Sequence, residues 1–241
     1  MKDQYFGDLN DYRKYGLLRM LADAGSFRIG VCWMLTPPDG RRDGSRLRYL
    51  EQPERFRAHD PLLFDALHES VKARQVRCVA EIERAGSADG DTRAPLLPGA
   101  AFYPAIVPDG GASRAEWFGR MLDHFRDTDL VFFDPDNGLE VASKPWGRRG
   151  SSKYLFWREA EAAWSRGLSL LFYQHFPRVD RGRCTARLVR EANRRLRPAQ
   201  VFAFRTSSVL FLLAAQARHV CPHHQRAAAV RGGWRGQIEV I

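Results

Sequence analysis

The sequence predicts an α/β fold whose mostly parallel sheet ends in an antiparallel hairpin. Strand-like apolar runs alternate with amphipathic segments along most of the 241 residues, which is typical of a parallel sheet with helices on both faces. The last two strand-like runs, 199–205 and 208–215, have only Thr206 and Ser207 between them. A crossover needs more residues, so we expect these two strands to pair as a hairpin.

The N-terminal part is expected to place a helix before the first strand. Apolar residues recur at helical spacing over 9–25, and Gly25 is a suitable residue to end that helix. The apolar run 28–35 then predicts a strand. Residues 36–60 are rich in Pro, Gly and Arg and predict a long loop, and loops of this length inside a domain are usually functional or mobile.

The next part of the chain predicts one helix and two strands. Asp60 is a suitable N-cap residue, and Pro61 suits the first position of the helix that follows. The apolar runs 76–82 and 100–107 predict the second and third strands. Residues 84–99 between them carry Gly, Ser, Asp and Pro and predict a flexible surface excursion.

The remaining elements follow the same alternation. We expect Ser113 to cap a helix that continues to about Arg126. A strand is predicted over 129–134, a helix over 151–167 and a strand over 168–176, with a further helix over 184–196 before the hairpin. Residues 1–241 are expected to form a single domain, because a chain of this size builds one substantial core.

Charge and cysteine content limit the classes of function. The chain carries 38 Lys and Arg against 28 Asp and Glu, a formal net charge of +10. A basic chain favours an anionic partner, and we expect nucleic acid or a nucleotide. The four cysteines are far apart and show no CxxC pair, so neither a disulfide framework nor a zinc ribbon is indicated. No apolar run reaches the length of a membrane span, and we expect a cytoplasmic protein without a membrane partner.

The segment "LVFFDPDNGLE", residues 130–140, is the strongest candidate for an active site. In open α/β sheets ligands bind beyond the carboxyl ends of the strands, and this strand delivers Asp134, Asp136 and Asn137 to that edge. The strand over 168–176 ends at the same edge with His175. We therefore predict that these four residues form the catalytic group. The competing structural interpretation is a strand-to-helix loop whose polar side chains bind backbone amides.

A comparison with phosphatases gives a second interpretation. The apolar strand followed by Asp-x-Asp is similar to the nucleophile motif of haloacid-dehalogenase-type phosphatases, although Gly138 follows where that family has Thr or Val. In this alternative the protein is a magnesium-dependent phosphoester hydrolase or nuclease. Asp134, Asp136 and Glu140 would bind Mg²⁺, and the Arg-rich loops would bind phosphate.

The same segment also resembles the Asp/Asn-Pro-Pro-aromatic motif of N6-adenine and related amino methyltransferases. Together with the helix and strand that follow, it is similar to the large-subunit ribosomal RNA adenine-N6 methyltransferase family and, less closely, to the partner methyltransferases of three-Cys-motif proteins. The resemblance implies a Rossmann-like methyltransferase fold that binds S-adenosylmethionine and methylates an amine. It extends to "NDYRKYGLLRML" and "VPDGGASRAEWF". Its implied cofactor-binding residues are Asn10, Lys14, Asp109 and a carboxylate at the end of the second strand, Glu81 or Glu83.

The sequence departs from that family in two places. The glycine-rich turn after the first strand is replaced by "MLTPPDGRRDG", where Gly40 is the nearest glycine and is followed by Arg41 and Arg42. Such a loop suits phosphate better than a sulfonium group. The second Pro and the aromatic residue of the motif are Asp136 and Asn137. A third hypothesis is therefore a non-catalytic relative of the fold that binds RNA or a protein.

Basic and aromatic residues cluster after the candidate motif. We predict that substrate or phosphate is bound by Arg148, Arg149, Lys153, Trp157 and Arg178 together with Arg41 and Arg42. The alternative is that the aromatic side chains pack a helix on the sheet while the arginines are solvated. The His- and Cys-containing tract "HVCPHHQ", residues 219–225, matches no standard zinc spacing, and no metal-binding residues are predicted outside the magnesium alternative.

Overall fold

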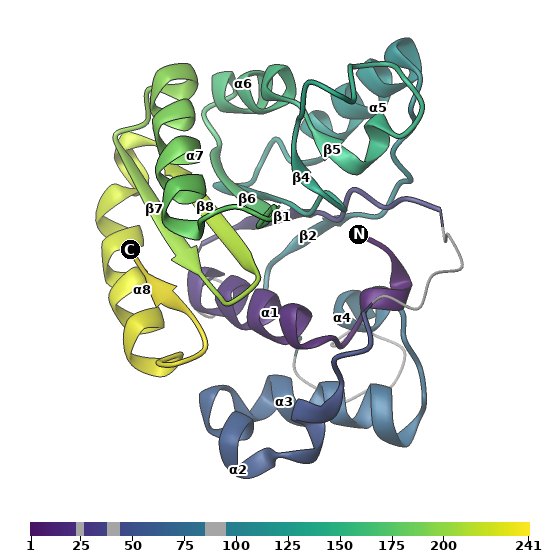
Figure 1. The fold of residues 1–241 in the computed structure, drawn as a ribbon, viewed down its shortest axis with the longest axis vertical. Helices are drawn as coiled ribbons and strands as arrows, with labels where there is room; N and C mark the ends of the chain where they lie inside the picture. Colours follow the sequence, from purple (N-terminus) through teal and green to yellow (C-terminus); the bar gives the residue numbers. More distant parts are fainter. Residues whose placement is uncertain (23–26, 38–43, 85–94) are drawn as a thin grey trace.

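A computed structural model describes residues 1–22, 27–37, 44–84 and 95–241. Within them a seven-stranded sheet lies between two layers of helices (Figure 1). The strands, in the order they take across the sheet, are β2 (Ala101–Tyr103), β1 (Ile29–Cys32), β3 (Leu130–Phe133), β6 (Ser169–His175), β8 (Val209–Ala215), β7 (Gln200–Arg205) and β9 (Glu239–Val240).

The sheet is mixed but mostly parallel. The neighbours β2, β1, β3 and β6 run parallel, while β8 is antiparallel to both β6 and β7. These pairings confirm the predicted α/β class with its mostly parallel sheet. The chain after the hairpin adds β9 antiparallel to β7, a strand that the sequence pattern did not predict.

Helices cover both faces of the sheet (Figure 1). Three of them, α1 (Leu9–Ala22), α3 (Pro61–His68) and α8 (Val220–Gly233), lie on one side, and the opposite side carries α5 (Gly111–His124), α6 (Trp157–Ser165) and α7 (Arg181–Leu196). Neighbouring strand residues point to opposite faces, so Phe132 packs with the first layer and Phe133 with the second. Burial on both faces accounts for the uninterrupted apolar run of β3.

Short elements complete the fold. Two brief helices, α2 (Pro53–Phe56) and α4 (Ala80–Arg84), lie near the first layer. A second sheet pairs β4 (Gly138–Leu139) with β5 (Tyr154–Leu155) in parallel. Single-turn helices of the described ranges are Asp3–Tyr5, Arg48–Glu51, Arg57–His59, Ser151–Lys153 and Ala217–His219, and a π-helical turn spans Glu69–Ala73.

Two of the expected segments take another structure. The strand predicted over 76–82 is wrong, because the chain there leads into α4 (Ala80–Arg84). Val79 and Ile82 are both buried. Apolar residues three positions apart can lie on one face of a helix, and a short apolar run does not distinguish such a helix from a strand. The loop predicted over 36–60 contains α2 and two single-turn helices in its described part.

Helix boundaries are partly as predicted. The side chain of Asp60 accepts a hydrogen bond from the Leu63 amide (3.1 Å), which confirms it as the N-cap of α3. Ser113 is not the cap of α5, since Gly110 has that place and the Ser113 hydroxyl donates to the Gly110 carbonyl within the first turn. The helix predicted over 151–167 begins only at Trp157, after β5.

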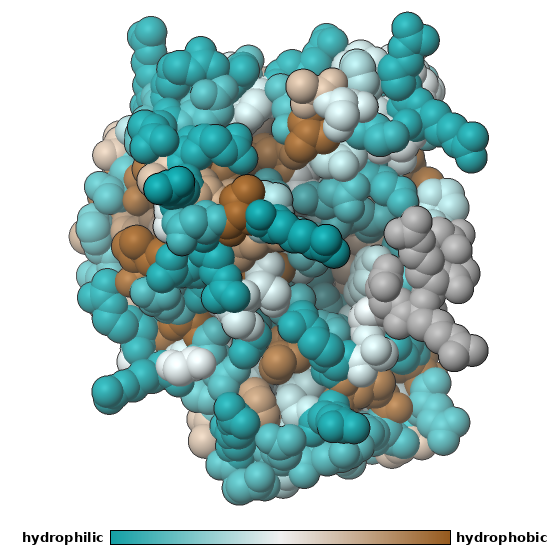
Figure 2. Space-filling model, in the orientation of Figure 1, coloured by the Kyte–Doolittle hydropathy of each residue, from teal (hydrophilic) through white to brown (hydrophobic). Residues whose placement is uncertain are grey.

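The surface of one face is mainly hydrophilic. Figure 2 shows its apolar side chains as small separate groups among polar ones. In the described ranges, no helix has both the length and the apolarity required to span a membrane.

Candidate functional site

The candidate site lies where the strand order of the sheet changes direction. From β1 the chain moves to β2 on one side and then to β3 on the other, and ligands of open α/β sheets bind at the carboxyl ends of such strands. A cavity of about 510 Å³ opens at this point. Six of the predicted site residues line it: Asn10, Lys14, Asp134, Asp136, Asn137 and His175.

A buried lysine neutralises the first carboxylate of the motif. Lys14 on α1 is 1% exposed, and its Nζ lies 2.7 Å from Asp134 Oδ2 and 2.7 Å from Asp11 Oδ1. Burial opposes the charged form of Lys14, but the two carboxylates outweigh burial and raise its pKa. Burial raises the pKa of Asp11, and Lys14 only partly offsets this. Asp11 therefore protonates at a higher pH than a free aspartate does.

The second carboxylate of the motif is held by the start of the chain. Asp136 Oδ1 lies 2.8 Å from the ammonium group of Met1, and its Oδ2 accepts a hydrogen bond from Thr36 (2.7 Å). The Lys2 Nζ is 3.4 Å from Oδ2. Burial of Asp136 works against ionisation, yet the Met1 ammonium and the hydroxyl outweigh it, so the pKa of Asp136 is lowered.

The turn after the motif requires glycine. Gly138 has φ +107°, and a Cβ atom there would lie 2.5 Å from the Gln174 carboxamide. This close approach lets Gln174 accept from the Leu139 amide (2.9 Å) and donate to the Asn137 carbonyl (3.3 Å). Asn137 and His175 lie exposed at the rim. Loss of hydration against the surrounding protein lowers the pKa of His175, although Asp134 favours its charged form.

The ionic charges of the described residues around the cavity are balanced. Four acidic side chains face four cationic groups: Asp8, Asp11, Asp134 and Asp136 against Lys2, Lys14, Arg46 and the Met1 ammonium. Glu140 accepts from the Trp157 amide (3.2 Å) instead of joining Asp134. In the described part of the chain, no three His, Cys, Asp or Glu side chains are grouped to hold a metal ion.

Three predicted cofactor residues lie outside the cavity. Glu81 lies on α4, where it accepts from Ser70 and Arg74, and Glu83 accepts from the Trp33 indole (2.7 Å). Neither therefore lies at the end of a second strand. Asp109 accepts from the amides of Gly150 (2.8 Å) and Ser152 (2.7 Å). These amides outweigh the effect of burial and lower its pKa, so Asp109 fixes the loop before β5.

The predicted substrate-binding residues do not form one group. Trp157 is buried at 5% exposure and packs edge-on to Phe172 (5.9 Å), as the structural alternative expects. Arg148 and Arg149 are exposed on the loop that precedes β5, and Lys153 is partly buried. Arg178 is exposed after β6 and lines a neighbouring cavity. The predicted residues Gly40, Arg41 and Arg42 lie outside the described residues.

Among the lining residues that sequence reasoning missed are Asp8 and Arg46. Asp8 accepts from the Asn10 amide (2.8 Å) and from the Arg46 amide (3.1 Å). An Asp just before an apolar helical pattern is a recognised N-cap signal, so Asp8 could have been predicted. Arg46 comes from the loop before residues 48–51, and no local pattern indicates that it reaches the cavity.

A buried arginine holds the segment around β5 against α5. Arg114 is fully buried, and it donates to Glu159 through Nε (2.8 Å) and Nη2 (2.9 Å). It also donates to the carbonyls of Ser151 (2.8 Å) and Tyr154 (2.5 Å). This network fixes the strand that pairs with β4 directly after the motif.

Comparison with protein-family models, curated proteins and solved structures finds no match to this chain. The geometry and chemistry of the site itself therefore indicate the function.

Proposed function

We propose that this protein is an S-adenosylmethionine-dependent methyltransferase-like protein that acts on an amine of nucleic acid or a nucleotide. The observation that carries the proposal is the cavity at the carboxyl ends of β1 and β3, which gathers Asp134, Asp136, Asn137 and His175 with two residues of α1. The antiparallel strand β8 between β6 and β7 supports the Rossmann-like methyltransferase fold on which the proposal depends.

The residues of the cavity suit the cofactor. Its volume of about 510 Å³ falls in the range of roughly 300–1,000 Å³ that small-molecule sites occupy. Asp8 and Asp11, at the start of α1, line the cavity and offer carboxylate oxygens to ribose hydroxyls, in place of the predicted Glu81 and Glu83. When bound, S-adenosylmethionine would supply the activated methyl group.

The protein side chains would then orient the acceptor amine. The Asp134 carboxylate and the Pro135 carbonyl, which follow β3 directly, would accept hydrogen bonds from the N–H groups. Hydrogen bonding of both N–H groups leaves the nitrogen lone pair directed at the methyl donor. Lys14 would hold Asp134 in place through its 2.7 Å contact.

No observation favours the magnesium-dependent hydrolase over this proposal. Lys14 and the Met1 ammonium already neutralise Asp134 and Asp136, so a divalent cation would compete with two protein cations for the same oxygens. Glu140, the expected third ligand, is bound to the Trp157 amide.

Titration calorimetry and methyl-transfer assays test the proposal. We expect S-adenosylmethionine to bind, and transfer of labelled methyl to RNA or nucleotides to fall about 100-fold in Asp134→Ala, because an interaction with the reacting amine is lost. Asp127→Ala, an exposed aspartate outside the cavity, is the matched control and should keep full activity. Absence of S-adenosylmethionine binding in the folded protein would reject the proposal. Magnesium binding that disappears in Asp134→Asn would instead support the hydrolase, and RNA binding alone the non-catalytic hypothesis.

A further inference from the structure

Adjoining cavities extend from the candidate site along the carboxyl edge of the sheet. The site shares Asn137 and His175 with a second cavity, which in turn shares Phe176 and Pro177 with a third. The third shares Arg181 with a fourth, whose volume is about 900 Å³. These adjoining cavities, together called the groove below, follow the edge of the sheet from Asp134 to the end of α8.

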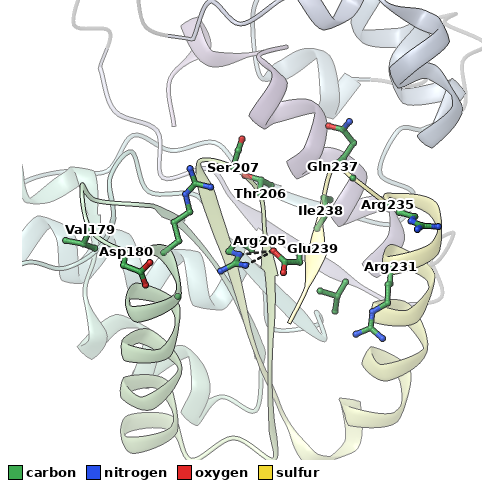
Figure 3. A pocket seen from close by; sticks show the side chains of 14 residues that line it. Val179, Asp180, Arg205, Thr206, Ser207, Arg231, Arg235, Gln237, Ile238 and Glu239 are labelled. Atoms are coloured by element: carbon green, nitrogen blue, oxygen red, sulfur yellow. Dashed lines mark hydrogen bonds and ion pairs between the residues drawn. The ribbon is translucent and has the colours of Figure 1, made fainter.

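The far part of this groove lies between two helices. Figure 3 shows Val179 and Asp180 at the start of α7 on one side, and Arg231 and Arg235 on α8 and the chain after it on the other. The paired side chains of Arg205 and Glu239 lie between the two sides, on β7 and β9. Strands thus form the floor of the groove and helix ends form its walls.

The acidic side chains of the groove are already bound within the protein. Asp180 accepts from the Arg183 amide (2.8 Å) as the N-cap of α7. Glu239 accepts from Arg205 through Nε (2.9 Å) and Nη2 (2.7 Å). Arg205 therefore neutralises Glu239, whereas Asp180 keeps its charge and its hydrogen bond to the helix N-terminus.

Four arginines then give the groove an excess of positive charge. Arg178, Arg181, Arg231 and Arg235 are exposed, and among the described residues no acidic group forms an ion pair with any of them. Four like charges along one groove cost free energy unless an anion is bound there.

We propose that this groove binds the backbone of a single-stranded nucleic acid. Arginine guanidinium groups bind phosphate oxygens in bidentate geometry and also stack on bases. The four arginines are distributed along the connected cavities, which suits a chain of phosphates better than one isolated anion. Val179 is 58% exposed beside them and offers an apolar contact to a sugar or base.

The groove would lead a bound nucleic-acid strand to the candidate site. Its near end opens beside Asn137 and His175, so a nucleotide there could turn its base toward Asp134. Enzymes that act on a base need it outside the stack, and a single strand meets this requirement. The placement of a base near Asp134 rests on the proposed function, whereas the binding of the nucleic acid rests only on the groove.

Fluorescence anisotropy with a labelled single-stranded RNA of about 12 nucleotides, a length within the usual site sizes, tests the inference. The variant Arg181→Ala/Arg231→Ala/Arg235→Ala should lose at least about 30-fold in affinity. Its slope of log affinity against log salt should fall by about 2, because each phosphate contact to a single strand contributes roughly 0.7. The measurements need no S-adenosylmethionine, so they remain valid if methyl transfer fails.

A matched variant separates the effect of the groove arginines on affinity from the effect of the total charge. Arg120→Ala/Arg126→Ala/Arg166→Ala removes the same charge from exposed residues on α5 and the turns before β3 and β6, at the opposite edge of the sheet. It should lose less than about threefold in affinity. Equal losses in the two variants, or no loss in the groove variant, would overturn the inference. So would competition by polyglutamate as strong as that by unlabelled RNA, since this would indicate an acidic peptide. Equal melting temperatures of the two variants exclude unfolding as the cause.

Discussion

His223 is a buried histidine that the fold keeps neutral. Its side chain is fully buried on α8, with the rings of Phe27 (5.0 Å) and Phe202 (6.1 Å) against it. Neither ring nitrogen has a hydrogen-bond partner in the described structure. Burial, followed by the nearby charge of Arg226, lowers the pKa of His223 from 6.5 to about 3. Within the His- and Cys-containing tract 219–225, His223 is therefore a residue of the core.

The low pKa of His223 predicts a loss of stability in acid. The unfolded chain binds a proton at His223 below about pH 6.5, whereas the folded chain does so only near pH 3. This contribution to stability is complete above pH 6.5 and is lost as the pH falls toward 3, by up to about 1.4 kcal/mol for each pH unit. Urea unfolding at several pH values should therefore show a shallower acid dependence in His223→Leu than in the wild-type protein. Parallel curves would contradict the assignment.

Local spacing predicted only part of the charge network around Asp134. The i,i+3 pair Asp11 and Lys14 can be read from a helical sequence. The second partner of Lys14, Asp134, lies 120 residues further along the chain, and only tertiary packing brings the two together. The position of the motif was therefore predictable from the strand pattern, while its neutralisation by Lys14 was not.

At the scale of elements, α1 and α8 approach each other closely at one glycine. A Cβ atom on Gly16 would lie 1.9 Å from the Trp234 ring, which is fully buried. Trp234 also packs on Tyr12 (4.9 Å between ring centroids), so it has little freedom to move. Glycine at this position permits the contact between the two helices.

Replacement of Gly16 should therefore destabilise the protein. We expect Gly16→Ala to lower the free energy of unfolding by about 1–3 kcal/mol, as overpacking of a core does. Gly119 on α5 is the matched control, because no atom lies within 4 Å of the position of its Cβ. Gly119→Ala should raise stability by roughly 0.5–1 kcal/mol through helix propensity. Denaturant unfolding measures both variants, and equal effects would show that α1 and α8 do not meet at Gly16.

Apolar periodicity predicted the elements that bury apolar side chains and missed those that bury polar side chains. The central strands β3 and β6 and the hairpin strands match uninterrupted apolar runs. The helix α8 has no such signal, since its buried face consists of His223, Arg226, Ala227 and Val230. The strand β9 has two residues and is defined by its pairing with β7. Such elements follow from tertiary contacts that no local pattern encodes.

At the scale of the whole molecule, the sheet links the two helix layers through shared strands. Phe132 and Phe133 are consecutive and fully buried on opposite faces. The Gly16–Trp234 contact belongs to the first layer, and the Arg114–Glu159 network to the second. A disturbance of either layer must therefore alter the strands on which the other layer packs. This coupling is the physical reason to expect a single domain over 1–241.

Hydrogen exchange followed by mass spectrometry tests that coupling. In the wild-type protein, the amides of β3 and β6 should exchange only by global unfolding, and at least about 100-fold more slowly than those of the exposed residues 141–145. If 1–241 unfolds as one unit, Gly16→Ala should accelerate exchange in β3 and in α5 by the same factor, although α5 lies on the opposite face from Gly16. That factor should correspond to the change in unfolding free energy from denaturant titration. Acceleration confined to α1 and α8 would instead show that the two layers unfold separately.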